Sequence, residues 1–225
     1  MDEKERLELY LHYSLSLTGG FMGAYALINR SEIFGSAQTS NLIHSVIDLL
    51  GGNWESILLR LAALFLFILA IMASVLLPRY YKINLRLGCI VLELIVVAAL
   101  GFFPESMNPM EALYPVFFIM ALQWCTFGNV RGYVCSTIFS TNNLRQFIAS
   151  LCEYYYDKDQ KHLEKAKIYG GTLLYYHLGA ASAILSSIPL GIQSVWLCLI
   201  PLCISLALLE AERLLLKVRA SQASL

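Results

Sequence analysis

Long apolar runs, separated by short polar stretches, dominate the chain. A helix that crosses the hydrocarbon core of a bilayer needs about 20 mostly apolar residues, and six runs approach that length. Pro78, Pro104, Pro109 and Pro189 fall at their borders, where a residue that cannot continue a helix is expected. The pattern predicts an all-α polytopic membrane protein with six transmembrane helices. The predicted helices are Leu9–Ile28, Ile57–Leu77, Leu87–Phe103, Ala112–Phe127, Ile168–Ile188 and Ile192–Leu209.

The composition supports a membrane location. Of the 225 residues 58% are apolar and only 14% are charged, whereas a soluble domain has roughly a quarter charged residues. These values exclude intrinsic disorder and an ordinary soluble enzyme. Sixteen basic residues balance sixteen acidic ones, so the charge gives no reason to expect a nucleic-acid partner. The six cysteines have no C-x-x-C spacing, and we expect neither a metal site nor a cofactor.

Lys and Arg are distributed unevenly among the connections. The N-terminal segment, the second and fourth connections and the C-terminal tail together carry twelve basic residues. The other connections carry Glu55, Glu105 and Glu111, and their one basic residue is Arg30 beside the first run. The positive-inside rule therefore predicts a multi-pass protein of the cytoplasmic membrane with both termini in the cytoplasm. The twelve residues are Lys4, Arg6, Arg79, Lys82, Arg86, Lys158, Lys161, Lys165, Lys167, Arg213, Lys217 and Arg219.

A polar interruption occurs twice, after the first and after the fourth apolar run. Thr39-Ser-Asn-Leu42 matches Thr141-Asn-Asn-Leu144 at an offset of 102 residues, and Arg30 matches Arg131 at an offset of 101. Each interruption continues into a short, half-polar segment, and the Ser, Thr and Asn residues at its start favour helix N-caps. The segments, about residues 37–51 and 141–155, are either re-entrant half-helices or amphipathic helices on the membrane surface.

The repeated interruption divides the chain into two three-helix repeats. The first is residues 1–103, with its break near 29–41, and the second is residues 104–225, with its break near 128–143. Because each half has an odd number of crossings, the second half must be inserted upside down. Inverted repeats with broken helices are a recurring plan of secondary transporters, whose substrate lies near the midplane at the breaks.

The same residues resemble a known family. Gly20-Phe-Met-Gly-Ala24, Gln38-Thr-Ser-Asn-Leu42, Leu122-Gln-Trp124 and Ser140-Thr-Asn-Asn-Leu-Arg145 are similar to motifs of the YoaK-like family, bacterial inner-membrane proteins named for a domain of unknown function. The resemblance covers nearly the whole chain and implies six spans. The sequence departs from the family pattern at Gly23, where an Asp is common, and at Ser40 and Asn142, where glycines are common.

Polar residues at membrane depth are candidates for the functional site. A charge there costs about 2.5–3.5 kcal/mol on insertion scales, so each needs a partner or a function. Glu93 lies in the middle of the third run and is a candidate for proton coupling, or else a structural partner of Arg60, Arg145 or a hydroxyl. Arg131 has two interpretations, an anion clamp or a side chain that extends to the headgroups. The predicted substrate-binding residues are Arg30, Gln38, Thr39, Asn41, Gln123, Asn129, Arg131, Thr141, Asn143 and Arg145.

These residues point to transport. No catalytic signature is present, and we do not expect an enzyme. The leading hypothesis is a small secondary transporter or facilitator for a small polar or anionic solute. The alternatives are an intramembrane enzyme that acts on a lipid or quinone, and an accessory subunit that does not transport. The expected partners are the bilayer, the solute and a second copy, bound through the small-residue faces at Gly170-Gly171 and Gly179–Ala183.

Overall fold

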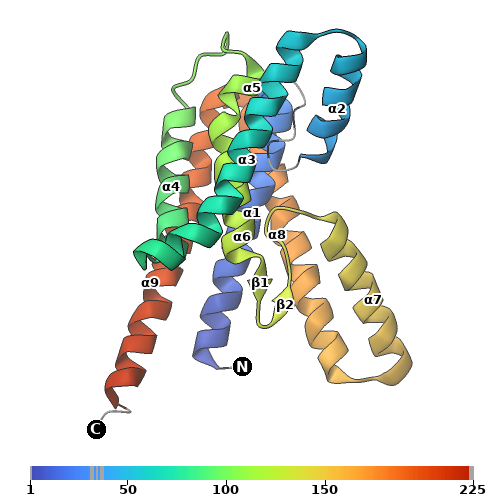
Figure 1. Ribbon diagram of the computed structural model, residues 1–225. Coiled ribbons are helices and arrows are strands. Elements are labelled where there is room, and N and C mark those ends of the chain that lie inside the picture. Colours follow the sequence, from blue (N-terminus) through green and yellow to red (C-terminus); the bar gives the residue numbers. More distant parts are fainter. Residues whose placement is uncertain (1, 31–32, 34, 36–37, 223–225) are drawn as a thin grey trace.

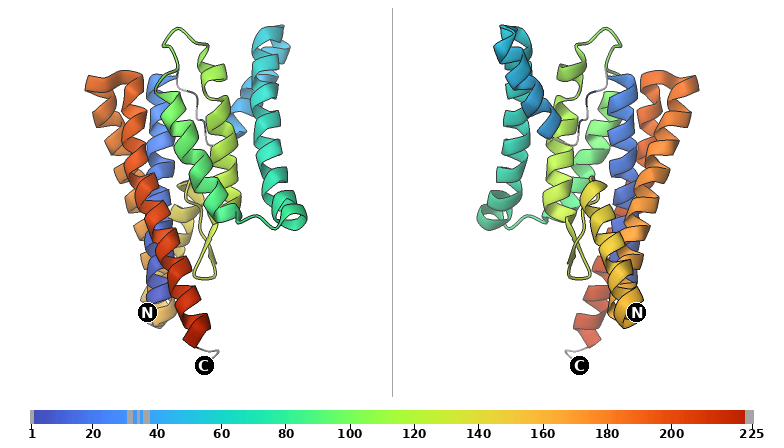
Figure 2. Two further views of the ribbon diagram at one scale, coloured as in Figure 1. Left: turned by 90° about the vertical axis from the view of Figure 1, so that its left-hand side faces the viewer. Right: turned by 90° about the vertical axis from the view of Figure 1, so that its right-hand side faces the viewer.

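The structure is a computed structural model that describes residues 2–30, 33, 35 and 38–222, and these residues are almost entirely helical (Figure 1). A short hairpin of β1 (Asn129–Val130) and β2 (Tyr133–Val134) interrupts the helices, and a 3-10 helix η1 (Gly191–Cys198) joins the last two. The long helices run along one axis in alternating directions (Figure 2). The α-helices are α1 (Glu3–Asn29), α2 (Thr39–Leu50), α3 (Trp54–Tyr81), α4 (Leu85–Leu100), α5 (Pro109–Ala112), α6 (Tyr114–Phe127), α7 (Thr141–Asp157), α8 (Gln160–Leu190) and α9 (Leu199–Gln222).

Three segments of the described chain are long and apolar enough to cross a membrane. They are Trp54–Tyr81, Pro109–Phe127 and Gln160–Gln222. The third contains both α8 and α9. The chain reverses its direction between these two helices at Gly191, which has a φ of 53°. These segments fit a membrane protein, and the largely exposed apolar surface of α3 suits contact with lipid.

Two of the prolines do not lie where the sequence predicts. Pro78 and Pro189 lie inside α3 and α8, so the prediction that they mark helix borders is wrong. Each is close to the C-terminal end of its helix, where the missing N–H removes one hydrogen bond and the remaining turns persist. Pro109, in contrast, begins α5, where a residue without an N–H is well tolerated.

The two parts of the chain pack reciprocally. The element order α1-α2-α3-α4 is repeated as α6-α7-α8-α9. Helix α1 packs against α8 and α9, and α6 packs against α3 and α4. Helix α2 lies along α3, and α7 lies along α8. The first helix of each part therefore finds its main partners in the other part, and the two parts are interleaved.

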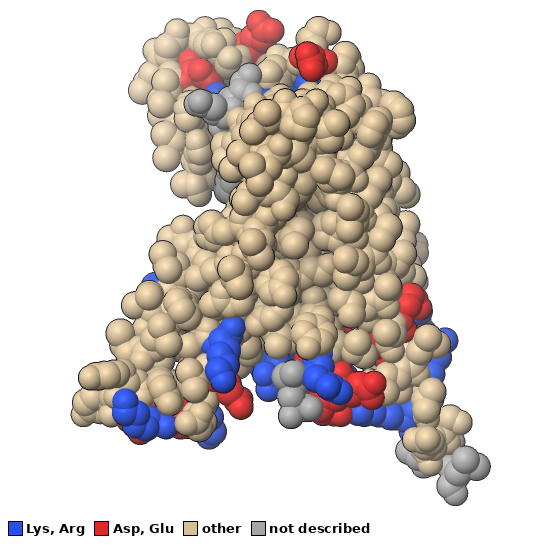
Figure 3. Space-filling model, turned by 180° about the vertical axis from the view of Figure 1, so that it is seen from behind, with Lys and Arg blue, Asp and Glu red and all other residues tan. Residues whose placement is uncertain are grey.

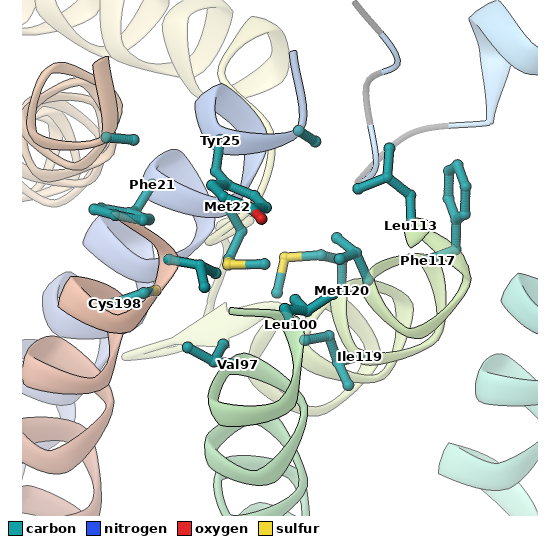
Figure 4. Close-up of a cluster of buried hydrophobic side chains, with 14 of the residues drawn as sticks. Phe21, Met22, Tyr25, Val97, Leu100, Leu113, Phe117, Ile119, Met120 and Cys198 are labelled. Atoms are coloured by element: carbon teal, nitrogen blue, oxygen red, sulfur yellow. The ribbon is translucent and has the colours of Figure 1, made fainter. Parts of the chain in front are cut away.

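The main hydrophobic core lies where α1, α4, α6 and η1 meet. Met22, Tyr25, Leu100, Phe117 and Met120 are fully buried there. The side chains of Met22 and Met120, from α1 and α6, point toward one another (Figure 4). The core thus forms between the opening helices of the two parts.

Both termini lie at one end of the molecule, and Lys and Arg gather at that end (Figures 1 and 3). Arg219 donates two hydrogen bonds to the Asp2 carboxylate, at 2.7 and 2.8 Å, and lowers the pKa of Asp2 to about 2. Arg86 and Glu212 form a second two-pronged ion pair, with distances of 3.1 and 2.8 Å. Termini at the same end are consistent with an even number of passes along the axis.

Glycines allow the backbones of α1 and α8 to touch. A Cβ atom at Gly20 would collide with the carbonyl oxygen of Tyr176, and one at Gly179 would collide with that of Leu17. A Cβ at Gly171 would meet the ring of Tyr13. The small-residue face of α8 therefore contacts α1 of the same chain.

We expect Gly20→Ala to destabilise the protein by about 1–3 kcal/mol, because the added methyl group has no space against a backbone carbonyl. Gly88→Ala in α4 is the matched control, since nothing lies within 4 Å of its added Cβ. The control should be neutral or up to about 1 kcal/mol more stable, through its helix propensity. Unfolding of the purified variants in a mild detergent measures the stability of each. Equal stability of the two variants would refute the close backbone contact between α1 and α8 at Gly20.

Candidate functional site

A cavity of about 820 Å³ lies between the N-terminal ends of α2 and α7. From the middle of the molecule α2 runs toward one end and α7 toward the other (Figure 1), and the space-filling surface is indented on this side of the molecule (Figure 3). The volume lies in the upper part of the range of roughly 300–1,000 Å³ that is typical of small-molecule sites. Four of the predicted substrate-binding residues line this cavity, namely Gln38, Thr39, Thr141 and Arg145.

Both helices begin at the cavity without a side-chain cap. The N-cap residues are Gln38 and Ser140, and in neither case does the side chain accept a hydrogen bond from the first turn. The capping that the sequence favours is therefore not observed. The first N–H groups of a helix have no partner within the helix, and they carry the positive end of its dipole. Two such ends face the same space here.

Further donors line the cavity. Gln38 is only 9% exposed, and its Nε2 has no hydrogen-bond partner within the described part of the chain. Arg145 is exposed and donates to the side-chain oxygen of Asn142 at 3.1 Å. Among the described residues that line the cavity there is no Asp or Glu. The cavity therefore offers hydrogen-bond donors and positive charge, which suit an anion.

The rest of the cavity wall is largely aromatic. Phe67 comes from α3, Trp124 from α6, Phe139 from the loop before α7 and Tyr176 from α8. The ring centroid of Trp124 lies 5.2 Å from that of Phe139 and 6.4 Å from that of Phe67. Such edge and tilted contacts form a continuous apolar surface. The sequence analysis did not identify this wall.

Asn143 lies in the first turn of α7, but its side chain stabilises the preceding loop and does not line the cavity. Its Nδ2 donates to the carbonyl oxygens of Ser136 at 2.7 Å and of Phe139 at 2.8 Å, and its Oδ1 accepts from the Ser136 N–H. The corresponding Asn41 is also buried, and its Oδ1 accepts from Arg60 at 3.4 Å. Both residues orient the helix starts, and neither lines the cavity.

Gln123 is fully buried and also acts as a bridge. Its Nε2 donates to the carbonyl oxygen of Leu15 at 3.0 Å and to the hydroxyl of Thr137 at 2.8 Å. These bonds join α6 to α1 and to the loop before α7. Gln123 lies outside the cavity, so its predicted contact with a substrate has no support in this arrangement.

Three further predicted residues lie away from the cavity. Arg30 ends α1, is buried, and donates to the carbonyl oxygen of Pro104 at 3.2 Å. Arg131 lies at the turn of the hairpin, where its N–H donates to Glu8 and its side chain reaches Glu5 at 3.6 Å. Carboxylates thus surround Arg131, an environment that suits neither an anion clamp nor a headgroup contact. Asn129 opens the same hairpin and lines a separate, smaller cavity.

The hairpin itself was missed in the sequence analysis. Val130 and Tyr133 flank a two-residue turn of Arg131 and Gly132, which have φ values of 50° and 81°. Two residues with positive φ are typical of tight hairpin turns, and glycine adopts such a φ without strain. The Arg-Gly pair between apolar residues is the signal that could have indicated it.

Glu93 is fully buried in α4 and has no cationic partner among the described residues. One of its oxygens accepts a hydrogen bond from the Cys89 thiol at 3.4 Å, and the other has no partner in the described residues. Arg60, a predicted structural partner, instead pairs with Asp48 at 2.9 Å. Glu93 does not line the cavity between α2 and α7.

We expect Asn143→Ala to destabilise the protein by about 1–3 kcal/mol, because it leaves buried carbonyl groups without donors. Asn142→Ala, at the neighbouring exposed position, is the control and should change stability by less than about 0.5 kcal/mol. Thermal unfolding in detergent compares the two. An Asn143→Ala variant as stable as the control would show that the Asn143 amide does not stabilise the loop before α7.

Comparisons with known proteins identify a family. No curated protein and no solved structure matches the chain significantly. A family model described as a protein of unknown function, DUF1275, matches residues 11–208. That range includes both short helices and every residue of the cavity between them. Since the match covers most of the sequence, the chain belongs to the DUF1275 family of proteins of unknown function.

Proposed function

We propose that the protein is a small secondary transporter or facilitator of the cytoplasmic membrane that moves an anionic solute through the cavity between α2 and α7. The convergence of two uncapped helix N-termini on one cavity carries this proposal. Arg145 and the Nε2 of Gln38 add donors, and no carboxylate is among the described residues that line the space.

The electrostatics favour an anion strongly. The N-terminus of a helix is equivalent to about half a positive elementary charge, so two such ends complement one negative charge. Their effect is larger in a site shielded from water, where the dielectric constant is low. Half-helices whose N-termini point at an anionic group near the midplane recur in secondary transporters.

Inverted repeats explain the reciprocal packing. Exchanging α1-α2-α3-α4 with α6-α7-α8-α9 converts the α1–α8 contact into the α6–α3 contact, and the α2–α3 contact into the α7–α8 contact. In this proposal α1, α3, α4, α6, α8 and α9 cross the membrane, and α2 and α7 are re-entrant half-helices that start at mid-depth. Rocking of the two repeats about the shared cavity then gives access from either side.

The orientation and the coupling group complete the proposal. The end that carries both termini and most Lys and Arg faces the cytoplasm under the positive-inside rule, and the YoaK-like resemblance supports a bacterial inner membrane. Glu93 is the group that we assign to proton coupling, because a buried carboxyl without a cationic partner can bind and release a proton. The described part of the cavity lining contains no His, Cys, Asp or Glu to act as a base, so we prefer transport to catalysis.

Labelling tests the orientation. A cysteine introduced at Glu105 or Gln193, in whole cells, should react with a maleimide that cannot cross the membrane, and one at Lys161 should react only after the cells are opened. Glu105 lies beside Gly191 at the end opposite the termini, because α4 and α8 both end there. The unsubstituted chain gives the background from the natural cysteines. Labelling of Lys161→Cys in intact cells would overturn the orientation.

Arg145→Gln tests the transport site. We expect anion uptake into proteoliposomes to fall by roughly tenfold or more, the equivalent of one lost charge-assisted hydrogen bond of about 1.5–3 kcal/mol. Arg213→Gln is the control, because Arg213 pairs with Glu210 in α9, away from the cavity. The control should retain uptake, and equal losses in both variants, or no loss in either, would contradict the proposed site.

A further inference from the structure

We propose that the solute is a singly charged organic carboxylate with an apolar body, preferably an aromatic one. This inference rests on the proposed function and names the substrate class of the same cavity. It depends on how the donors and the apolar side chains are arranged around the space.

The donors come from the starts of α2 and α7, whereas Phe67, Trp124 and Tyr176 come from three other helices. The helix N-termini, Gln38 and Arg145 belong to the starts of α2 and α7. Phe67 and Trp124 belong to α3 and α6, against which the starts of the short helices are set. A ligand that fills the cavity therefore meets donors on one part of its surface and aromatic carbon on another, so it is amphiphilic.

The size of the cavity disfavours an inorganic anion. Sites of roughly 300–1,000 Å³ usually enclose molecules of drug size, and this cavity of about 820 Å³ is near the upper limit. A lone chloride or phosphate ion would leave the rings of Phe67, Trp124 and Phe139 in contact with water. An apolar ligand body covers these rings, and each square ångström of apolar surface removed from water contributes about 25 cal/mol.

The charge of the lining favours one negative charge. Arg145 is the one formally charged residue in the described lining. The other donors are neutral, and they include the Gln38 amide, whose Nε2 has no partner among the described residues. A carboxylate has two oxygens that can accept from Arg145 and from neutral donors together. A phosphate dianion would bring a second charge for which the lining has no cation.

Binding to the full-length protein in phosphatidylcholine nanodiscs tests the inference by calorimetry. The probes are phenylacetate, decanoate, acetate, inorganic phosphate and the neutral phenylacetamide. We expect phenylacetate to bind at least about tenfold more tightly than acetate, phosphate or phenylacetamide. Arg145→Gln should weaken phenylacetate binding by about tenfold, and Trp124→Phe should weaken it by a smaller factor. Arg213→Gln and Trp54→Phe are the controls, and both should bind as the unsubstituted chain does.

The outcomes separate the inference from the proposed function. Binding of phosphate or acetate without preference for phenylacetate would overturn the inference and leave anion transport intact. Equal binding of phenylacetamide would show that the carboxylate is unnecessary and would overturn it as well. Tight binding of decanoate in place of phenylacetate would support a carboxylate with an apolar body and would overturn the preference for an aromatic one. If no anion binds and Arg145→Gln leaves uptake unchanged, both proposals fall together.

Discussion

The close contact between the backbones of α1 and α8 is the constraint on which the rest of the structure depends. Gly20 and Gly179 permit it, because a side chain at either position would overlap a carbonyl oxygen of the other helix. The neighbouring Gly19 faces the carbonyl oxygen of Thr137, in the loop before α7, with the same lack of space. One surface of α1 therefore positions both α8 and the start of α7, and with them one wall of the cavity.

The non-helical segment before α7 is the next consequence. Buried backbone groups must find hydrogen-bond partners within the protein, and the Asn143 amide provides partners for several groups of this loop, while the Gln123 amide ties the loop to α1. Asn143 binds the carbonyl groups of Ser136 and Phe139, and Gln123 ties the Thr137 hydroxyl to α1. None of these bonds engages the first N–H groups of α7, and the N-cap Ser140 makes no side-chain cap. The helix start therefore remains available to a ligand.

The sequence predicts the two short helices well, because a polar start before an apolar stretch is a local signal, and they begin at Thr39 and Thr141. The cavity contains residues from both starts. The roles of individual polar residues are less predictable. Arg131 is held by Glu5 and Glu8 of α1, more than 120 residues away in the chain, and Asn143 differs from Asn142 only in the direction of its side chain. The aromatic wall is hidden for a related reason, since Phe67 and Trp124 within apolar runs look the same as residues that face lipid.

The two parts of the chain, α1 to α4 and α6 to α9, contribute unequally to the cavity, and this asymmetry bears on the proposed transport. At the offset of 102 residues that aligns the short helices, Arg145 corresponds to Ile43, so the one cation in the described lining comes from α7. Phe67 of α3 lines the same space, together with Trp124 of α6 and Tyr176 of α8. A carboxylate with an apolar body would therefore point its charge toward α7 and its body toward the rings of α3, α6 and α8. Because α7 runs toward the end that carries the termini (Figure 1), the carboxylate would face that end. In the proposed transport cycle, the state open to one side of the membrane and the state open to the other would then hold the ligand differently.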